Sequence, residues 1–125
     1  MIRRPPRSTL DRSSAASDVY KRQVSAQGNI LAGPDVVDMM VEAFEMTDGH
    51  LSFRLQAALE AGQAAGGDSR GMQSAAMIIV KEDGGVWLNN DVVLRLQVDD
   101  SDNPIAELRR LVELAARQRD RTRGR

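Results

Sequence analysis

The sequence contains no cysteine and a single histidine, His50, in 125 residues. Without cysteine the chain has neither disulfide bonds nor thiolate metal sites, and one imidazole does not make a histidine-rich metal centre. The absence of disulfides fits a reducing compartment, so we expect a cytoplasmic protein, and no signal peptide is visible at its start. We predict no metal and no cofactor.

Aromatic residues and long apolar runs are also scarce. Phe, Trp and Tyr make up 3% of the chain, so any core has to be built from aliphatic side chains and methionine. No apolar run reaches the roughly 20 residues that cross a bilayer, and we expect no membrane partner. A chain of 125 residues is long enough for one small domain.

Charge is unevenly distributed, although the net charge is −1. Residues 1–23 carry six basic and two acidic side chains, residues 24–116 carry six and fifteen, and residues 117–125 carry five and one. Nucleic-acid-binding surfaces are basic, so the acidic body argues against a nucleic-acid partner. Residues 117–125 have no apolar anchor, so we expect a disordered basic tail. The alternative is that its arginines contact nucleic acid or an acidic partner.

Residues 1–23 show neither helical nor strand periodicity, and Pro5-Pro6 blocks a helix. The peptides MIRRPPRSTL and SSAASDVYKRQ in this stretch resemble translated sequencing-adapter sequence, which is found at the ends of metagenomic gene models. The alternative is a genuine disordered basic arm. On the adapter interpretation the true gene extends upstream of Val24, and the chain is a fragment whose true N-terminus is missing.

The body, residues 24–116, begins with a short strand or extended entry over residues 24–31. Ala32-Gly33-Pro34-Asp35 is a helix start, and the helix that follows places Val36, Val37, Met40, Val41 and Phe44 on one face. Residues 47–50 end this helix, with His50 expected as a solvated loop residue. A second helix is predicted over about residues 51–65, with Gly62 on a stripe suited to close packing.

The second half of the body has strand character. Residues 75–80 form a continuous apolar run, typical of a strand buried on both faces. A hairpin turn is expected at residues 82–85 and a further short strand at residues 86–88. Residues 92–98 alternate, with Leu94, Leu96 and Val98 pointing one way. A last helix is predicted over about residues 103–118.

The turn between the second helix and the apolar run, residues 66–76, combines three glycines with Asp68 and Arg70. Glycine permits positive φ and close backbone approach. The charged pair is either a local structural clamp or part of a site, and both interpretations stay open. A nucleotide phosphate loop is disfavoured, because no Gly-Lys-Ser/Thr follows and the turn precedes a strand.

Three carboxylates, Asp99, Asp100 and Asp102, precede the last helix. Carboxylates are ligands for calcium and magnesium, but the glycine and glutamate of an EF-hand loop are absent here. We favour a structural role, in which Asp102 or Asn103 caps the helix that begins at Pro104.

Several short groups of residues carry a family resemblance. They are Gln27–Gly33, Arg54–Leu59, Gly66–Gly71 with Gln73–Ala76, and Val98–Asp100 with Pro104–Leu108. In this order, over residues 27–114, they resemble DUF family 1028, a bacterial family of unknown function with an N-terminal-nucleophile (Ntn) hydrolase-like fold. The family's Val-Asp-Asp group is usually flanked by arginine and histidine, where this chain has Gln97 and Ser101.

The resemblance implies an αββα sandwich, an α+β fold, of which this chain is the C-terminal half, with three helices and two to three antiparallel strands. In Ntn hydrolases the nucleophile is a Thr, Ser or Cys at the mature N-terminus, and its α-amine is the base. No residue of this chain matches it, so we predict no catalytic residue and no hydrolase activity for the chain itself. With so few strands, residues 75–80 would stay half bare, favouring self-association into a homo-oligomer.

Six polar residues are candidates for substrate binding: Gln27, Asn29, Asp68, Arg70, Gln73 and Ser74. Arginine binds carboxylates bidentately, and asparagine donates hydrogen bonds to oxyanions. We expect the whole protein to be an amidohydrolase acting on an unknown small molecule. The alternative is a non-catalytic small-molecule-binding or scaffold protein with the same fold.

Overall fold

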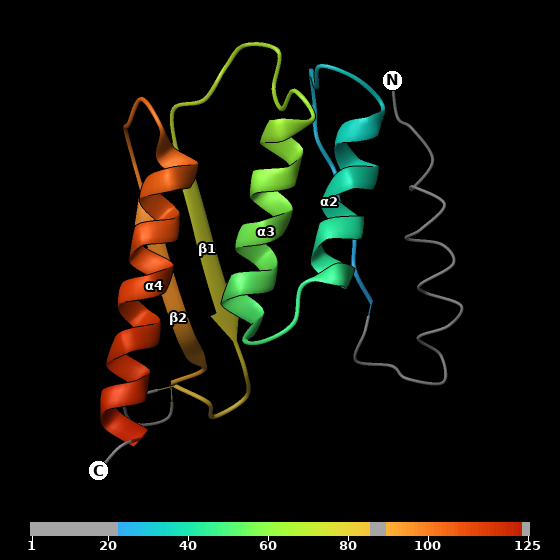
Figure 1. The fold of residues 1–125 in the computed structure, drawn as a ribbon. Coiled ribbons are helices and arrows are strands. Elements are labelled where there is room, and N and C mark those ends of the chain that lie inside the picture. Colours follow the sequence, from blue (N-terminus) through green and yellow to red (C-terminus); the bar gives the residue numbers. More distant parts are fainter. Residues whose placement is uncertain (1–22, 86–89, 124–125) are drawn as a thin grey trace. The chain divides into compact units, whose positions relative to one another are not determined.

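The computed structural model describes residues 23–85 and 90–123 (Figure 1). The described residues form three helices and two strands: α2 (Asp35–Met46), α3 (Leu51–Ala64), β1 (Ala75–Val80), β2 (Val92–Val98) and α4 (Pro104–Arg123). The expected α+β class is therefore confirmed. None of the described helices combines the length and the apolar character that crossing a membrane requires. The basic stretch 1–22 and the strand predicted at residues 86–88 lie outside the described residues.

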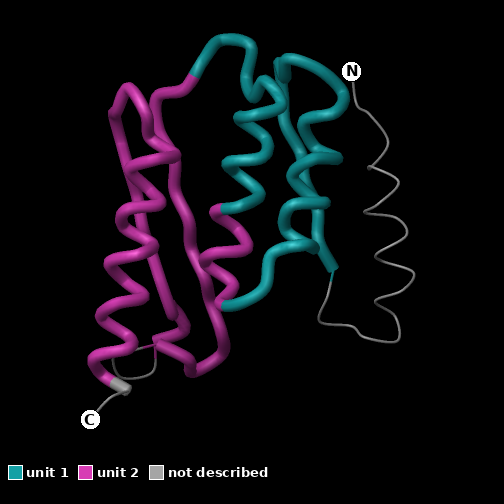
Figure 2. Tube along the Cα trace, viewed as in Figure 1, with its two compact units in different colours: residues 1–49, 57–71 teal, residues 50–56, 72–125 magenta. Residues whose placement is uncertain are grey.

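The chain divides into two compact units (Figure 2). Unit 1 comprises residues 1–49 and 57–71, and its described part contains α2 and most of α3. Unit 2 comprises residues 50–56 and 72–125, and it contains the start of α3, both strands and α4.

Unit 1 is built on the apolar face of α2. Val36, Val37 and Val41 are buried, as the helical spacing predicts. The helix begins after Pro34. Asp35 and Asp38 lie in its first turn, where the positive end of the helix dipole stabilises their negative charges. Met40 packs on α3 at Gly62, where its sulfur lies 2.9 Å from the position a Cβ atom would occupy. The predicted close approach at Gly62 is therefore confirmed.

Unit 2 is a two-stranded antiparallel sheet covered by α4 (Figure 1). The register pairs Ala75 with Val98 and Met77 with Leu96, so the inward residues of both strands share one face. Leu108 and Val112 of α4 are fully buried. Burying such side chains removes apolar surface from water at roughly 25 cal/mol per Å², which makes this face the core of the unit.

Strand β1 is buried on one face only, so the apolar run does not have the two covered faces it is typical of, and it stays half bare as expected for a chain with so few strands. Met77 and Ile79 are 6% and 8% exposed, whereas Ile78 and Val80 are 50% and 62% exposed. The reason is that α4 covers one face of the sheet, and in the described structure the outward side chains of β1 remain in contact with solvent. Strand β2 alternates as predicted, with Arg95 and Gln97 exposed.

Helix α4 is longer than the sequence pattern predicts. It begins where expected, and Asn103 caps it, because the Asn103 side-chain oxygen accepts a hydrogen bond from Ala106 N at 3.4 Å. It continues to Arg123 instead of ending near residue 118. Residues 117–123 are therefore helical and not a disordered tail. Arginine and glutamine favour helices without any apolar anchor, and the Thr122 hydroxyl donates to the Gln118 carbonyl within the last turns.

The one-sided sheet leads to a matched pair of stability predictions. Ile79→Ala should destabilise the chain by about 2–4 kcal/mol, because it opens a cavity under α4. Ile78→Ala removes the same atoms from the exposed face and should cost less than about 1 kcal/mol. Urea unfolding followed by circular dichroism measures both changes. Equal losses in the two variants would contradict the assignment of the faces.

Candidate functional site

The glycine turn after α3 is joined to residues 30–32 by three hydrogen bonds within unit 1. Ala32 N donates to the Gly67 carbonyl at 2.8 Å, and Ser69 N donates to the Ile30 carbonyl at 2.9 Å. The Ser69 hydroxyl donates to the same Ile30 carbonyl at 2.7 Å. These bonds form an isolated antiparallel bridge between Leu31 and Asp68. The predicted extended entry at residues 24–31 thus holds the turn in place.

Backbone conformation in this turn requires glycine. Gly66 has a φ of 120°, and a Cβ atom there would lie 2.6 Å from the Cβ of Ala32. Gly71 has a φ of 103° with open space around it. Residues with a side chain rarely adopt such φ angles, so glycine is needed at these positions for the backbone to follow this path.

Ile30 is a strained residue at the same place. Its φ is 54°, in the left-handed region that β-branched residues avoid. The side chain is 50% exposed, so burial does not compensate for the strain. The unusual conformation coincides with the two hydrogen bonds that its carbonyl accepts from Ser69. Such strain clusters at functional sites, which supports a site beside this turn.

Asp68 and Arg70 form a doubly hydrogen-bonded pair on the turn. Arg70 Nε lies 3.0 Å from Asp68 Oδ1, and Arg70 Nη2 lies 2.7 Å from Oδ2. The backbone N–H of Arg70 also donates to Oδ1 at 2.7 Å. Asp68 therefore fixes both the turn and the guanidinium plane. The Arg70 side chain remains 66% exposed.

The pairing changes the acidity of Asp68. The hydrogen bonds from Arg70, first from its side chain and then from its backbone, lower the pKa of Asp68 from 3.8 to about 2. The same contact raises the pKa of Arg70 above its ordinary value. Both groups are therefore charged at neutral pH, and a carboxylate with so low a pKa is a poor general base.

The remaining candidate residues are distributed over both units. Gln27 and Asn29 are exposed on the segment that leads into Ile30, and Gln27 Nε2 donates to Ser25 Oγ at 3.0 Å. Gln73 and Ser74 belong to unit 2 and are also exposed. The structure thus brings Asp68 and Arg70 into direct contact, and it places Gln27 and Asn29 on the segment that is bonded to the same turn.

A sequence model described as a family of unknown function, DUF1028, matches residues 9–108. The chain belongs to DUF1028. The match begins inside the basic stretch 1–23, which the sequence pattern places outside the domain. No curated protein matches the sequence.

A solved DUF1028 structure, that of a protein from Silicibacter pomeroyi, is similar to this chain. The two share 35% sequence identity with a TM-score of 0.57. The similarity covers 70% of this chain and 36% of the other chain, so the present chain spans about a third of that relative.

The acidic group before α4 is organised by hydrogen bonds in this DUF1028 chain. Asp99 accepts a hydrogen bond from Gln97 Nε2 at 2.6 Å, and Asp100 accepts a longer one, 3.4 Å, from Gln73 Nε2. In the described ranges 23–85 and 90–123, no three His, Cys, Asp or Glu side chains gather as metal ligands do. Gln73 is further fixed because its carbonyl accepts from Ser101 N.

The sequence pattern did not predict the partly buried polar group at the start of α3. His50 is half-buried, not solvated, and its Nδ1 accepts a hydrogen bond from Ser52 N at 3.1 Å. Ser52 and Gln56 are fully buried, and Gln56 Nε2 donates to the Ile105 carbonyl of α4 at 2.8 Å. The four-residue spacing of Ser52 and Gln56 was the available signal, since it places both on one helix face.

The first site prediction concerns the titration of Asp68. Because its pKa in the folded chain is lowered, the stabilising charge is fully present above pH 3.8 and is lost as the pH falls through about 2. Arg70→Gln should return the pKa of Asp68 toward 3.8. NMR titration of the Asp68 carboxyl carbon measures this value. The control Arg110→Gln removes the partner of Glu107 and should leave Asp68 unchanged.

The second site prediction compares two glycines of the turn. Gly71→Ala adds only the strain of a positive φ, which lowers the free energy of unfolding by about 1–2 kcal/mol. Gly66→Ala meets that cost and also overlaps Ala32, adding about 1–3 kcal/mol. Thermal unfolding of the two variants gives the difference. A Gly66→Ala protein as stable as Gly71→Ala would show that the turn does not lie against residues 30–32.

Proposed function

We propose that the whole DUF1028 protein is an Ntn-type amidohydrolase and that residues 24–116 of this chain supply one α/β layer of its sandwich. The turn at residues 66–71 and the segment at residues 27–32 then belong to the substrate-binding side. The activity resides in the complete protein, and the present chain by itself hydrolyses no amide.

The observation that carries the proposal is the one-sided sheet. In an αββα sandwich each sheet has a helix layer on one face and a second sheet on the other. The β1–β2 sheet has α4 on one face, and its other face exposes Ile78 and Val80. The same face carries Arg95 and Gln97 on β2, so its apolar part is the strip on β1, and this strip suits a second sheet as its cover. The greater length of the solved relative leaves ample chain to supply one.

Asp68 and Arg70 have different roles in this proposal. Asp68 holds the guanidinium through Nε and Nη2, and its low pKa keeps it from acting as a base. In the described structure Nη1 of Arg70 has no bond to another side chain, so it can donate to a ligand. A fixed, exposed guanidinium recognises carboxylates. The substrate is therefore an amide that also carries a carboxylate group.

The nucleophile in this proposal is a Thr, Ser or Cys at the mature N-terminus of the complete protein. Its α-amine takes the nucleophile's proton and later returns a proton to the leaving amine. Hydrogen-bond donors beside the scissile carbonyl stabilise the oxyanion that forms. Asn29 is exposed next to the strained Ile30 and is the candidate donor from this chain.

A panel of N-acyl amino acids and their neutral amide analogues tests the proposal in the full-length Silicibacter pomeroyi relative. We expect turnover, a preference of at least about tenfold for the carboxylate-bearing compounds, and an acyl adduct on the N-terminal residue by mass spectrometry. The present chain should show no turnover under the same conditions. Hydrolysis by the present chain, or the absence of turnover and of adduct in the relative, would reject the proposal.

Carboxylate recognition can be measured separately in the present chain. N-acetyl amino acids should shift the Arg70 Nε–H signal in NMR titrations, and Arg70→Gln should abolish the response. The matched control Arg95→Gln removes an exposed arginine from β2 and should leave the Arg70 response intact.

A second candidate function is binding without catalysis. The mutual Asp68–Arg70 bonds favour it, because they make a rigid recognition element in which neither group is available for proton transfer. Ligand shifts at Arg70 in a family whose full-length member has no turnover would support this alternative.

A further inference from the structure

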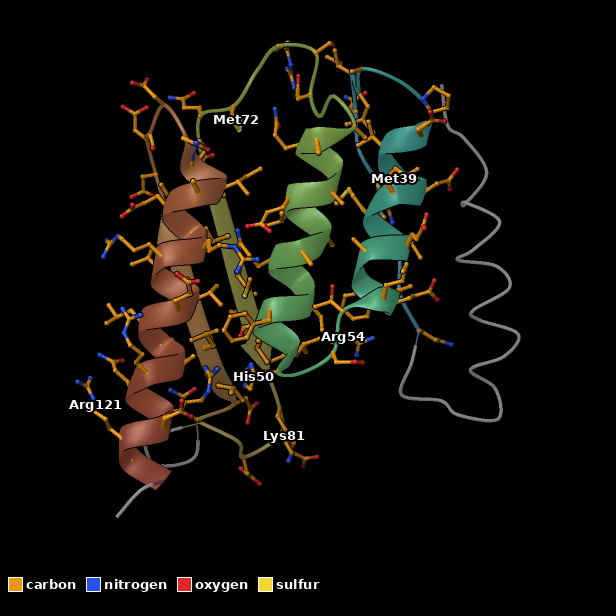
Figure 3. All side chains as sticks on the ribbon, in the orientation of Figure 1. Met39, His50, Arg54, Met72, Lys81 and Arg121 are labelled. Carbon is orange, nitrogen blue, oxygen red and sulfur yellow. The ribbon has the colours of Figure 1, made fainter. Side chains whose placement is uncertain are left out.

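The arginines at the C-terminal end of α4 differ from those earlier in the helix in their ion pairs. Arg109 lies 3.8 Å from Glu113, and Arg110 lies 2.6 Å from Glu107, so both have acidic partners one turn away. Arg117, Arg119 and Arg121 have no ion pair with any described residue. Arg121 projects from the last turns of the helix (Figure 3). We call these three residues the arginine end of α4.

This feature lies outside the part of the chain that matches the family. The DUF1028 match stops at residue 108, and the arginine end lies beyond it. The helix dipole favours a cation in the last turn of a helix, but its effect fades within that turn. Arg117 precedes the last turn, so the helix dipole does not account for all three arginines.

The opposite end of α4 has the complementary charge. Asp99, Asp100 and Asp102 are exposed just before Pro104, and within the described residues none of them forms an ion pair. A helix rises 1.5 Å per residue, so Asp102 and Arg117 are separated by roughly 20 Å along α4. The Debye length at physiological salt is about 8 Å, so the two clusters of one molecule barely interact.

We propose that α4 is an interface between two copies of this chain, which pair antiparallel along the helix. In this arrangement the arginine end of each copy faces the Asp99–Asp102 turn of the other, and a two-fold axis satisfies both ends at once. The exposed stripe between the ends includes Arg110 and Glu113, whose charges are already matched by Glu107 and Arg109. The middle of the interface is therefore neutral.

A second copy fits better than a nucleic acid or an anionic membrane. Residues 24–116 carry fifteen acidic and six basic side chains, so a polyanion approaching the arginine end would be repelled by the body. A whole second copy has a net charge of only −1, because its basic ends offset the acidic body, so its approach meets little net repulsion and it brings a short acidic turn of limited extent.

Charge reversal tests the interface in the full chain. Sedimentation velocity should detect dimers at about 50 mM salt that weaken several-fold near about 500 mM salt. Arg117→Glu with Arg121→Glu should raise the dimer dissociation constant by about tenfold or more. The measurements are made in an Ile78→Gln, Val80→Gln background, so that association through the bare sheet face does not contribute. Arg95→Glu with Lys81→Glu, two exposed residues of the strand region, is the control of equal charge change.

Mixing the reversed partners distinguishes this interface from other causes. The Arg117→Glu, Arg121→Glu chain should recover association when mixed with an Asp99→Lys, Asp100→Lys chain, because opposite charges meet again. A monomer at low salt, equal weakening in the control, or failure of the mixture to associate would overturn the proposal. Tighter binding to a single-stranded oligonucleotide or to phosphatidylserine vesicles than to a second copy would also overturn it.

Discussion

The hydrogen bonds between the glycine turn and residues 30–32 are the constraint on which unit 1 depends. They draw the chain after α3 back onto the segment that precedes α2, and the backbone has to pass close to Ala32 to make them. Gly66 is required there because a side chain would overlap Ala32. The same bonds hold Ile30 in a strained conformation and present Asp68 and Arg70 at the surface. These hydrogen bonds therefore fix both the path of the chain after α3 and the position of the Asp68–Arg70 pair.

Charge pairing within the turn determines what this site can do. Asp68 is committed to Arg70 through its carboxylate, and its lowered pKa removes it from proton transfer at neutral pH. The arginine is oriented yet still accessible, which suits recognition of an anion more than chemistry. In the reaction proposed above the base is the α-amine of the N-terminal residue, so no base is required at this turn.

The sheet of unit 2 sets the other limit on function. Its core side is complete, because α4 packs on the sheet and Met77, Ile79, Leu108 and Val112 are all buried. Its outward side keeps apolar residues in water, which carries a hydrophobic cost that a covering layer would remove. The chain spans about a third of the solved DUF1028 relative.

The sequence by itself determined the positions of α2, α3, β1 and β2, the start of α4 and the family. Helical spacing placed Val36 and Val41 in the core, and the glycines of the turn identified positive φ, because both depend on neighbours close in sequence. Tertiary structure alone decided which face of β1 is covered, since an apolar run of six residues does not record how many layers pack on it. It also decided that Asp68 pairs with Arg70 and that Gln56 is buried against Ile105, because such partners depend on how segments distant in sequence fix the backbone.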